Sequence, residues 1–443
     1  MHPLLEPETD NASEEDTISP WRNPAAWLRE QKLSRNFWIF FAAAFAFDLG
    51  FSIYYFLFNL YLLDLHLNEK AIGLVGGALA LGSVVGTLPA GFVAKKIGVR
   101  SLLMVCFVAA PAMGALRAVA IGEHPQVILA FIAGISMCLW GVCFLPAVAR
   151  LTSEKNRASA FSLIFSVSVG SSALGGIVCG YLPQWLHKAG FTPSAAEVKR
   201  LILLASCAVA ASGLMAVLKL QLPSPQATAA EMENIPGSIG RWRWRVHPFL
   251  VRFLPAMMLW TGVMASFMPF ANVYLSRALH LPLVRIGVIF SVAKIVQLCS
   301  GLVTPLLFRA LGLVKGIVAT QVLTAIALGS LAATQDPRLA VVLYLGFFAM
   351  QWMSSPGLYN LLMSGVPDSE RSTASAMTLF CNAVVSAGAT AIAGTLFTKF
   401  GYPRVLSGIA ILTMMAAMLF RFFVPAGTTQ ASALETEVLV ADS

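Results

Sequence analysis

An apolar run from Phe37 to about Leu63 is the feature that most restricts how this chain can fold. About 20 residues of α-helix cross roughly 30 Å of hydrocarbon, so a run of this length predicts a transmembrane helix. Asp48 lies well inside the run. A carboxylate at that depth is costly unless it faces protein or water, and it therefore indicates a functional site. The run predicts a membrane protein with an acid near the middle of its first helix.

The composition predicts that the whole chain is embedded in a similar way. Hydrophobic residues make up 58% of the chain, charged residues make up 12%, and the mean hydropathy is +0.76. A soluble chain would carry about twice that share of charge, so the apolar excess must face lipid. We expect an all-α polytopic fold whose twelve transmembrane helices lie near residues 37–63, 71–94, 101–121, 127–149, 158–183, 200–220, 253–275, 286–308, 315–334, 339–364, 373–397 and 403–424.

The polar segments divide the chain and orient it in the membrane. Lys and Arg concentrate in every second connection, which by the positive-inside rule places both termini in the cytoplasm. Because these cations are spread over short loops, the net charge of +9 reflects membrane topology and does not indicate nucleic-acid binding. We expect a cytoplasmic tail at 1–35, a six-helix bundle at 36–220, a cytoplasmic linker at 221–252, a second bundle at 253–424 and a cytoplasmic tail at 425–443.

The cysteines and the short motifs argue against a cofactor or an enzyme. The seven cysteines all fall within apolar runs and have no metal-ligand spacing, so we interpret them as small buried side chains. No P-loop or nucleotide fingerprint occurs, and no His-rich or Ser–Lys group stands at membrane depth. We therefore expect no metal, no cofactor and no catalytic residue.

An internal repeat relates the two halves of the chain. Asn59-Leu-Tyr61-Leu recurs as Asn272-Val-Tyr274-Leu, and Gly180 recurs as Gly394. Lys95-Lys-Ile-Gly98 recurs as Arg309-Ala-Leu-Gly312, and the segment from Glu154 to Ala160 recurs from Ser369 to Ala376 with a small slippage. Four matches in sequence order, at offsets near 214 residues, indicate two homologous six-helix units. An even number of spans in each half gives both units the same orientation in the membrane.

This parallel repeat resembles the major facilitator superfamily over residues 36–424. The family's loop between spans two and three has glycines, an acid and basic residues, and here it reads Gly91-Phe-Val-Ala-Lys95-Lys96-Ile-Gly98-Val-Arg100. Lys95 replaces the usual Asp, so the resemblance implies the tight turn without the full cytoplasmic latch. A short turn with positive-inside charge is the alternative. The implied loop and gate residues are Gly91, Lys95, Lys96, Gly98, Arg100, Glu154, Arg157, Glu370 and Arg371.

Spans five and eleven carry small residues at helical spacing. The family's antiporter signature, Gly-Pro-x-x-Gly-Gly, is matched by Ser171-Ser172-Ala-Leu-Gly175-Gly176, which lacks the proline. A plainer interpretation is that small residues let helices approach closely across the two bundles. These residues are Gly170, Gly175, Gly180, Ala387, Gly388 and Gly394.

Few polar groups lie deep enough to form a substrate or proton-coupling site. Asp48, Tyr55 and Asn59 share one face of the first helix. Asp48 and Lys294 are the acid and the base that we place well inside the hydrocarbon, and we expect them to share a polar cavity. A purely structural carboxyl and a lysine that extends to the interface are the alternatives. The candidate site comprises Asp48, Tyr55, Asn59, Trp140, Trp260, Lys294, Gln297, Gln351, Trp352, Asn360 and Asn382.

Some of these side chains also have structural interpretations. The tryptophans suit an organic substrate, but they could equally fill space between helices. Arg117, near the end of the third span, is interpreted as reaching the outer headgroups. We interpret the segments around Trp27 and Arg241–Arg245 as interfacial anchors, because Arg and Trp favour the headgroup layer.

The sequence thus predicts a secondary active transporter of a small organic solute, in which the two bundles rock around a central site and protons provide the coupling ion. We expect a monomeric, multi-pass protein of the bacterial cytoplasmic (inner) membrane, with the lipid bilayer and a small-molecule substrate as its partners. A facilitative transporter, a drug exporter and a non-transporting receptor of the same fold are the alternatives.

Overall fold

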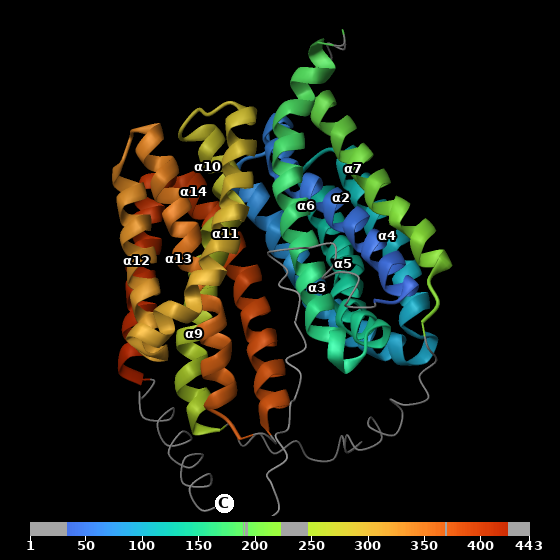
Figure 1. Cartoon of the computed structure of the whole chain (residues 1–443). Coiled ribbons are helices and arrows are strands. Elements are labelled where there is room, and N and C mark those ends of the chain that lie inside the picture. Colours follow the sequence, from blue (N-terminus) through green and yellow to red (C-terminus); the bar gives the residue numbers. More distant parts are fainter. Residues whose placement is uncertain (1–32, 189, 191–193, 223–246, 368–369, 424–443) are drawn as a thin grey trace, which may run out of the picture.

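The computed structural model describes residues 33–188, 190, 194–222, 247–367 and 370–423, and this part contains helices and no strands. The helices form two groups that lie side by side (Figure 1). The first group comprises α2 (Arg35–Asp64), α3 (Glu69–Ile97), α4 (Val99–Val119), α5 (Glu123–Leu151), α6 (Glu154–Lys188) and α7 (Ala195–Lys219). The second comprises α9 (Pro248–Phe267), η1 (Met268–Phe270), α10 (Ala271–Arg277), α11 (Leu283–Leu311), α12 (Leu313–Ala333), α13 (Pro337–Ser364) and α14 (Arg371–Phe423).

These elements account for the twelve predicted membrane crossings. Eleven helices in the described part are long and apolar enough to span a membrane, and α14 counts once among them although it has 53 residues. Gly401, at φ 75°, breaks α14 into two helices, since a positive φ does not fit an α-helix. Helices α9, η1 and α10 together make one crossing that is interrupted at Pro269. The predicted all-α fold of two six-helix bundles is confirmed.

Equivalent turns in the two groups adopt the same backbone conformation. Gly98 ends α3 at φ 85°, and Gly312 ends α11 at φ 80°. His66 and His280, in the connections that precede α3 and α11, have φ values of 62° and 51°. A positive φ is uncommon for a residue other than glycine, so its recurrence at the same place in both halves supports a structural repeat.

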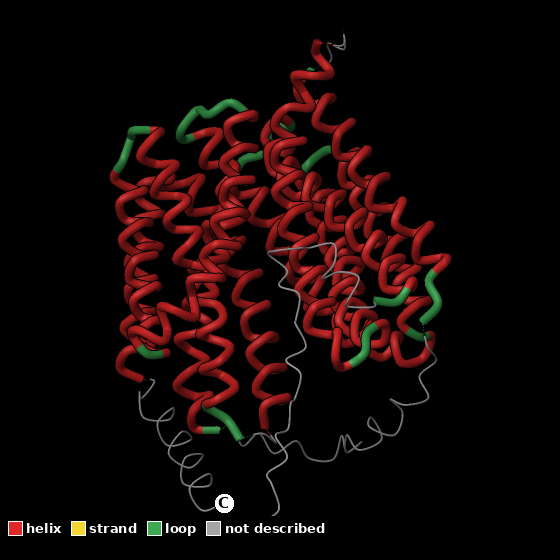
Figure 2. Tube along the Cα trace, viewed as in Figure 1, coloured by secondary structure: helices red, strands yellow, loops and turns green. Residues whose placement is uncertain are grey.

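The connections lie at two opposite faces of the molecule (Figure 2). We call the face where α2 begins and α14 ends the terminal face, which is the lower side in Figure 1. The opposite face, where α2 leads into α3 and α10 leads into α11, is the distal face. Asp48 and Lys294 lie near the middle of α2 and α11, so both are at mid-depth.

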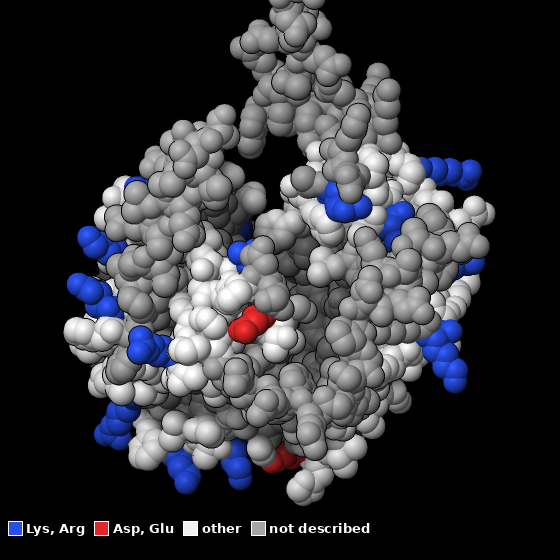
Figure 3. Space-filling model, turned by 90° about the horizontal axis from the view of Figure 1, so that it is seen from below, with Lys and Arg blue, Asp and Glu red and all other residues white. Residues whose placement is uncertain are grey.

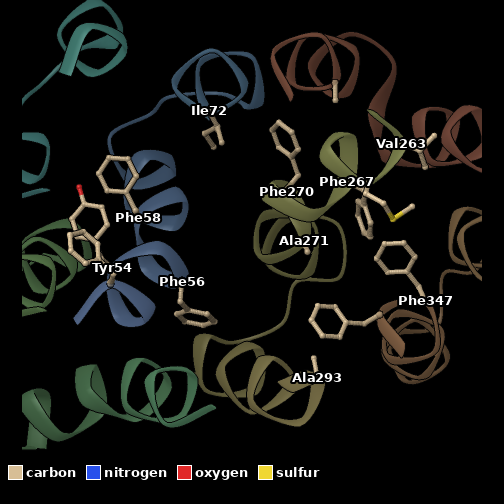
Figure 4. Close-up of a cluster of buried hydrophobic side chains, with 14 of the residues drawn as sticks. Tyr54, Phe56, Phe58, Ile72, Val263, Phe267, Phe270, Ala271, Ala293 and Phe347 are labelled. Atoms are coloured by element: carbon tan, nitrogen blue, oxygen red, sulfur yellow. The ribbon is translucent and has the colours of Figure 1, made fainter. Parts of the chain in front are cut away.

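Each group is packed around its own aromatic side chains. In the first group, the Trp140 ring stacks on Phe47 at 4.6 Å between centroids and meets Phe107 at 5.8 Å. In the second, the Phe267 ring contacts Phe347 at 5.4 Å (Figure 4). Since lipid tails are as apolar as these side chains, helix association in a membrane depends on such close packing.

Two seams of small residues join the groups in the distal half. Along α6 and α11, a Cβ added to Gly287 would lie 2.3 Å from the carbonyl oxygen of Gly176. Along α3 and α14, a Cβ added to Gly394 would lie 2.3 Å from the carbonyl oxygen of Glu69 and 2.9 Å from the Cα of Gly73. Only glycine permits this approach of one backbone to another.

The predicted role of the small residues holds for part of the set. Gly180 contacts Val284 of α11, while Ala387 and Gly394 contact α3. Gly175 instead packs on α2 within its own group, and a Cβ at Gly170 or Gly388 would meet no other atom within 4 Å. The contacts across the groups are therefore limited to the residues that lie in the distal half.

Candidate functional site

The two groups are joined by hydrogen bonds that gather in the distal half. The side-chain amide of Asn59 donates to the carbonyl oxygen of Pro269 at 2.7 Å, and that of Asn272 donates to the carbonyl oxygen of Phe56 at 2.7 Å. Ser291 of α11 donates to the Ala173 carbonyl oxygen of α6. Together with the glycine seams, these bonds close the distal half.

An apolar contact lies beside these bonds. The Phe56 ring of α2 meets the Phe290 ring of α11 at 5.2 Å between centroids, in an edge-to-face arrangement. Figure 4 shows Phe56 pointing from α2 toward α11, and Ile72 of α3 close to Phe270 of η1. The distal junction is therefore apolar as well as hydrogen-bonded.

The terminal half is open between the groups. Seen from the terminal face, the molecule is hollowed between its two halves (Figure 3). One face of α2 is partly exposed over most of its length, and Phe45 and Tyr55 on it are 40% and 39% exposed. Asn59 lies on the same face and contacts the second group, so this face is directed at the second group. In the terminal half, this face of α2 borders the space between the two groups.

Asp48 lies on this face of α2 and is half-buried. Its carboxylate has Ser168 of α6 as a hydrogen-bonding neighbour. One turn further along α2, the hydroxyls of Ser52 and Ser172 are 3.0 Å apart. The acid therefore lies at the edge of the hollow, where α2 meets α6, and its carboxylate has a hydroxyl partner.

Lys294 lies at similar depth on α11 but makes its contacts within the second group. Its ammonium donates to Oε1 of Gln297 at 3.3 Å and lies 5.6 Å from the centroid of the Phe348 ring on α13. In the described part of the chain, the salt bridges join Lys199 to Asp64 and Arg277 to Glu69. The structure thus does not pair Lys294 with Asp48.

Helix α13 contributes further side chains near Lys294. The Trp352 ring, 36% exposed, lies 6.3 Å from the Phe348 ring that Lys294 contacts. Oε1 of Gln351 is buried without a hydrogen-bond partner, and Asn360 is exposed. Lys294, Phe348 and Trp352 therefore form one contiguous group of side chains between α11 and α13.

Several other predicted site residues are engaged elsewhere. Trp140 belongs to the aromatic packing of the first group, and Trp260 is 4% exposed. Asn382 accepts a hydrogen bond from the Thr261 hydroxyl, which joins α14 to α9 within the second group. Asn59 lies in the distal junction, and Gln297 is buried against Lys294. Tyr55 remains exposed on the open face of α2, two helical turns distal to Asp48.

The predicted gate residues lie at the terminal face. Arg100 donates to the carbonyl oxygen of Leu218, and Arg371 donates to that of Met363, so each of these bonds stays within one group. Gly98 forms the predicted tight turn. Lys96 is exposed, and Gly91, Arg157 and Glu370 are partly buried. The side chains of Lys95 and Glu154 and the segments around Trp27 and Arg241–Arg245 lie outside the described residues.

Two features of the distal half differ from the sequence interpretation or were missed by it. Arg117 is 3% exposed, and its guanidinium stacks on the Phe58 ring at 4.2 Å, so the interpretation that it reaches the headgroups is wrong. Glu69 of α3 accepts from Arg277 of α10 at 3.0 Å and from the Tyr402 hydroxyl at 3.4 Å. No local signal reveals this cluster, because its three residues come from distant parts of the chain.

Comparisons with known proteins agree with this architecture. A family model described as Major Facilitator Superfamily matches residues 39–390. The nucleoside transporter NupG superposes with a TM-score of 0.70 at 15% identity, covering 88% of this chain and 100% of that one. A D-xylose-proton symporter gives 0.69 at 16% identity, covering 88% and 98%. The inward-open xylose transporter XylE from E. coli gives 0.67 at 15% identity, covering 87% and 95%. No curated protein sequence matches the chain.

Proposed function

This chain belongs to the major facilitator superfamily, and on that premise we propose that it is a secondary active transporter of a small organic solute that uses protons as its coupling ion. The family and its structural neighbours are transporters, so transport of a solute across a membrane is the function of the fold. The proposal adds the energy source, the kind of solute and the residues that act on it.

A single observation carries the proposal: the groups touch in the distal half and separate in the terminal half, and Asp48 lies near the middle of α2, between these two regions. Alternating access requires such a site near mid-membrane, reached from one side at a time. Asp48 can exchange a proton with water in the hollow. Ser168 next to it, and Tyr55 two turns away on the same face of α2, could orient a polar solute.

The terminal face is the cytoplasmic face in this proposal. Figure 3 shows Lys and Arg side chains around its rim, as the positive-inside rule expects for cytoplasmic connections. The structure then represents an inward-facing state of the transport cycle. Both termini and the linker between the groups would lie in the cytoplasm, and the membrane would be the bacterial inner membrane.

Lys294 and Trp352 are the second group's contribution to the proposed site. Lys294 is held at mid-depth by Gln297 and Phe348, in a position from which a rocking motion could bring it toward the first group. A solute that carries a negative charge or several acceptor oxygens would give the ammonium a partner, which the described residues do not provide beyond Gln297.

The test is uptake by proteoliposomes that contain the purified protein. Nucleosides and pentoses form the first screen, because similar structures include a nucleoside transporter and a D-xylose-proton symporter, and a thermal-shift assay selects the compounds that bind. We expect accumulation of the best ligand when the exterior is acidic, and its collapse when a protonophore is added. Protein-free liposomes are the control.

The possible results of this assay separate the alternatives. Uptake that equilibrates without accumulating, whatever the pH gradient, would indicate a facilitative transporter. Accumulation in response to an acidic interior would indicate export by exchange for protons. Binding without flux in either direction would favour a receptor of the same fold and would overturn the proposal.

A further inference from the structure

The distal junction contains two hydrogen bonds whose donors and acceptors occupy equivalent positions in the internal repeat. Asn59 and Asn272 are separated by 213 residues, and so are the residues whose carbonyl oxygens they bind, Phe56 and Pro269. Asn59 donates to Pro269, which lies three residues before Asn272. Asn272 donates to Phe56, which lies three residues before Asn59. Both donor–acceptor distances are 2.7 Å. The two bonds form a reciprocal pair related by the pseudo-two-fold axis of the molecule.

From this juxtaposition we propose that Asn59 and Asn272 are the residues that lock the distal gate, so that their reciprocal bonds set the balance between the two end states of transport. The proposal deepens the proposed function, because it takes this structure as one end state of alternating access. It also changes the predicted role of Asn59 from contact with the solute to control of the gate.

The backbone around Pro269 is built to accept such a bond. A proline lacks an N–H group, so it cannot donate to the carbonyl oxygen of Ala265 one turn earlier. The hydroxyl of Thr390 on α14 binds that oxygen instead, at 3.0 Å. The chain then passes through the 3₁₀ segment η1, where the carbonyl oxygen of Pro269 is directed at α2 and meets the Asn59 amide.

Asn272 is held in place for its part of the pair. Its side chain is 4% exposed, and its Oδ1 accepts a hydrogen bond from the N–H of Val273 while its Nδ2 donates to Phe56. Both ends of the amide are thus satisfied in this state. When the distal half opens, the donor must exchange the Phe56 carbonyl for water, at a net cost of about 1 kcal/mol for a typical hydrogen bond.

The surroundings place the pair at a position that controls access. A pocket of about 370 Å³ lies on the distal side of Asn59, between the groups, and it is lined by residues that include Leu60, Asp64, Lys199, Ser276 and Arg277. The Glu69–Arg277 ion pair and Tyr402 lie at the same face. The Asn pair therefore lies between this pocket and the middle of the membrane, and the Ser291–Ala173 bond lies deeper on α11, close to Lys294.

A distance measurement across the distal face tests the proposal without a known substrate. Ile121 and Gln335 are exposed residues in equivalent distal connections of the two groups, and both are distant in sequence from Asn59 and Asn272. Spin labels on Ile121→Cys and Gln335→Cys, in a background with Cys299→Ala and Cys381→Ala, report opening of the distal face by double electron–electron resonance. The full-length protein is measured in lipid nanodiscs.

We expect Asn59→Ala and Asn272→Ala each to raise the ratio of the long-distance to the short-distance population about fivefold, and the double variant to raise it by more than either. Ser407→Ala is the matched control, because it removes one hydrogen bond that stays inside α14. Since Asn59 is only half-buried, Asn59→Ala should fold even if the buried Asn272 does not tolerate replacement.

Unchanged distance distributions in correctly folded Asn59→Ala would overturn the gate proposal, even in a protein that transports solute normally. A shift toward the long distance in a protein that shows no flux would support the gate and count against the proposed function. A shift of the same size in Ser407→Ala would mean that loss of any hydrogen bond loosens the protein, and would also overturn the gate proposal.

Discussion

Replacing Asp48 by Asn is expected to abolish accumulation of the solute in proteoliposomes, so that the internal and external concentrations become equal. The amide has nearly the same shape as the carboxyl group and can keep a hydrogen bond to Ser168 on α6, but it cannot bind and release a proton. Solute exchange without a gradient should persist, because the path through the protein is intact. The measurement compares accumulation driven by a pH gradient with equilibrium exchange of labelled solute.

Two further variants make this result specific. Asp48→Glu keeps a titratable acid and should retain part of the accumulation. Asp336→Asn is the matched control, because Asp336 caps α13 outside the membrane and Asn caps a helix equally well. Full accumulation by Asp48→Asn would remove this acid from the coupling mechanism, and loss of both accumulation and exchange would mean that it binds the solute.

The fold was predictable from the sequence because a bilayer allows few solutions. Each backbone group in the hydrocarbon must be satisfied within its own segment, so apolar runs of about 20 residues become helices. The repeat predicted from the sequence is also seen in the backbone, since Gly98 and Gly312 take similar positive φ values of 85° and 80°. What the pattern did not reveal is the break at Pro269, where the predicted seventh span passes through a 3₁₀ segment.

The site was predictable only in part, and depth was the useful signal. Asp48 became a candidate because an acid at mid-membrane is costly unless it has a role. In the structure it is half-buried on the face of α2 that is directed at the second group, and its role stays a prediction. Its predicted proximity to Lys294 depended on the relative placement of two helices from different groups. The sequence contains no information about that distance, and the structure gives Lys294 other neighbours.

Contacts between side chains and backbone of different helices could not be predicted from the sequence either, because they depend on how the helices pack. Asn59 and Asn272 stood out as a repeated motif, but a shared position along two helices does not reveal that Asn59 donates to Pro269 and Asn272 to Phe56. Arg117 was misinterpreted because a cation near a helix end usually extends to the headgroups. Here the Phe58 ring gives the guanidinium a face to stack on within the bundle.

The second large effect is expected at the glycine seam between α6 and α11. In Gly287→Val, the new Cβ would lie 2.3 Å from the carbonyl oxygen of Gly176, and this atom belongs to backbone that cannot move aside alone. Overpacking of this kind costs about 1–3 kcal/mol or more. Since 1.4 kcal/mol changes an equilibrium tenfold, the ratio of the closed to the open distal state should fall by about fivefold to a hundredfold or more.

The expected result is a protein held with its distal face open, in which net transport falls by a similar factor while ligand binding from the distal side survives. Spin labels at Ile121→Cys and Gln335→Cys should then report the longer distance as the main population. Gly301→Val is the matched control, because it puts the same residue on the same helix where a new Cβ meets nothing within 4 Å.

The Gly287→Val variant distinguishes two mechanisms by which the distal half could close. If Gly287→Val transports normally and keeps the short distance between the labels, α6 and α11 can separate locally without moving the groups, and the structure is not an end state of a rocking motion. If Gly287→Val and Asn59→Ala both shift the population toward the long distance, the seam and the Asn pair act on the same equilibrium. Their combined effect in the double variant should then exceed that of either alone, because each removes a different stabilising contact from the closed distal state.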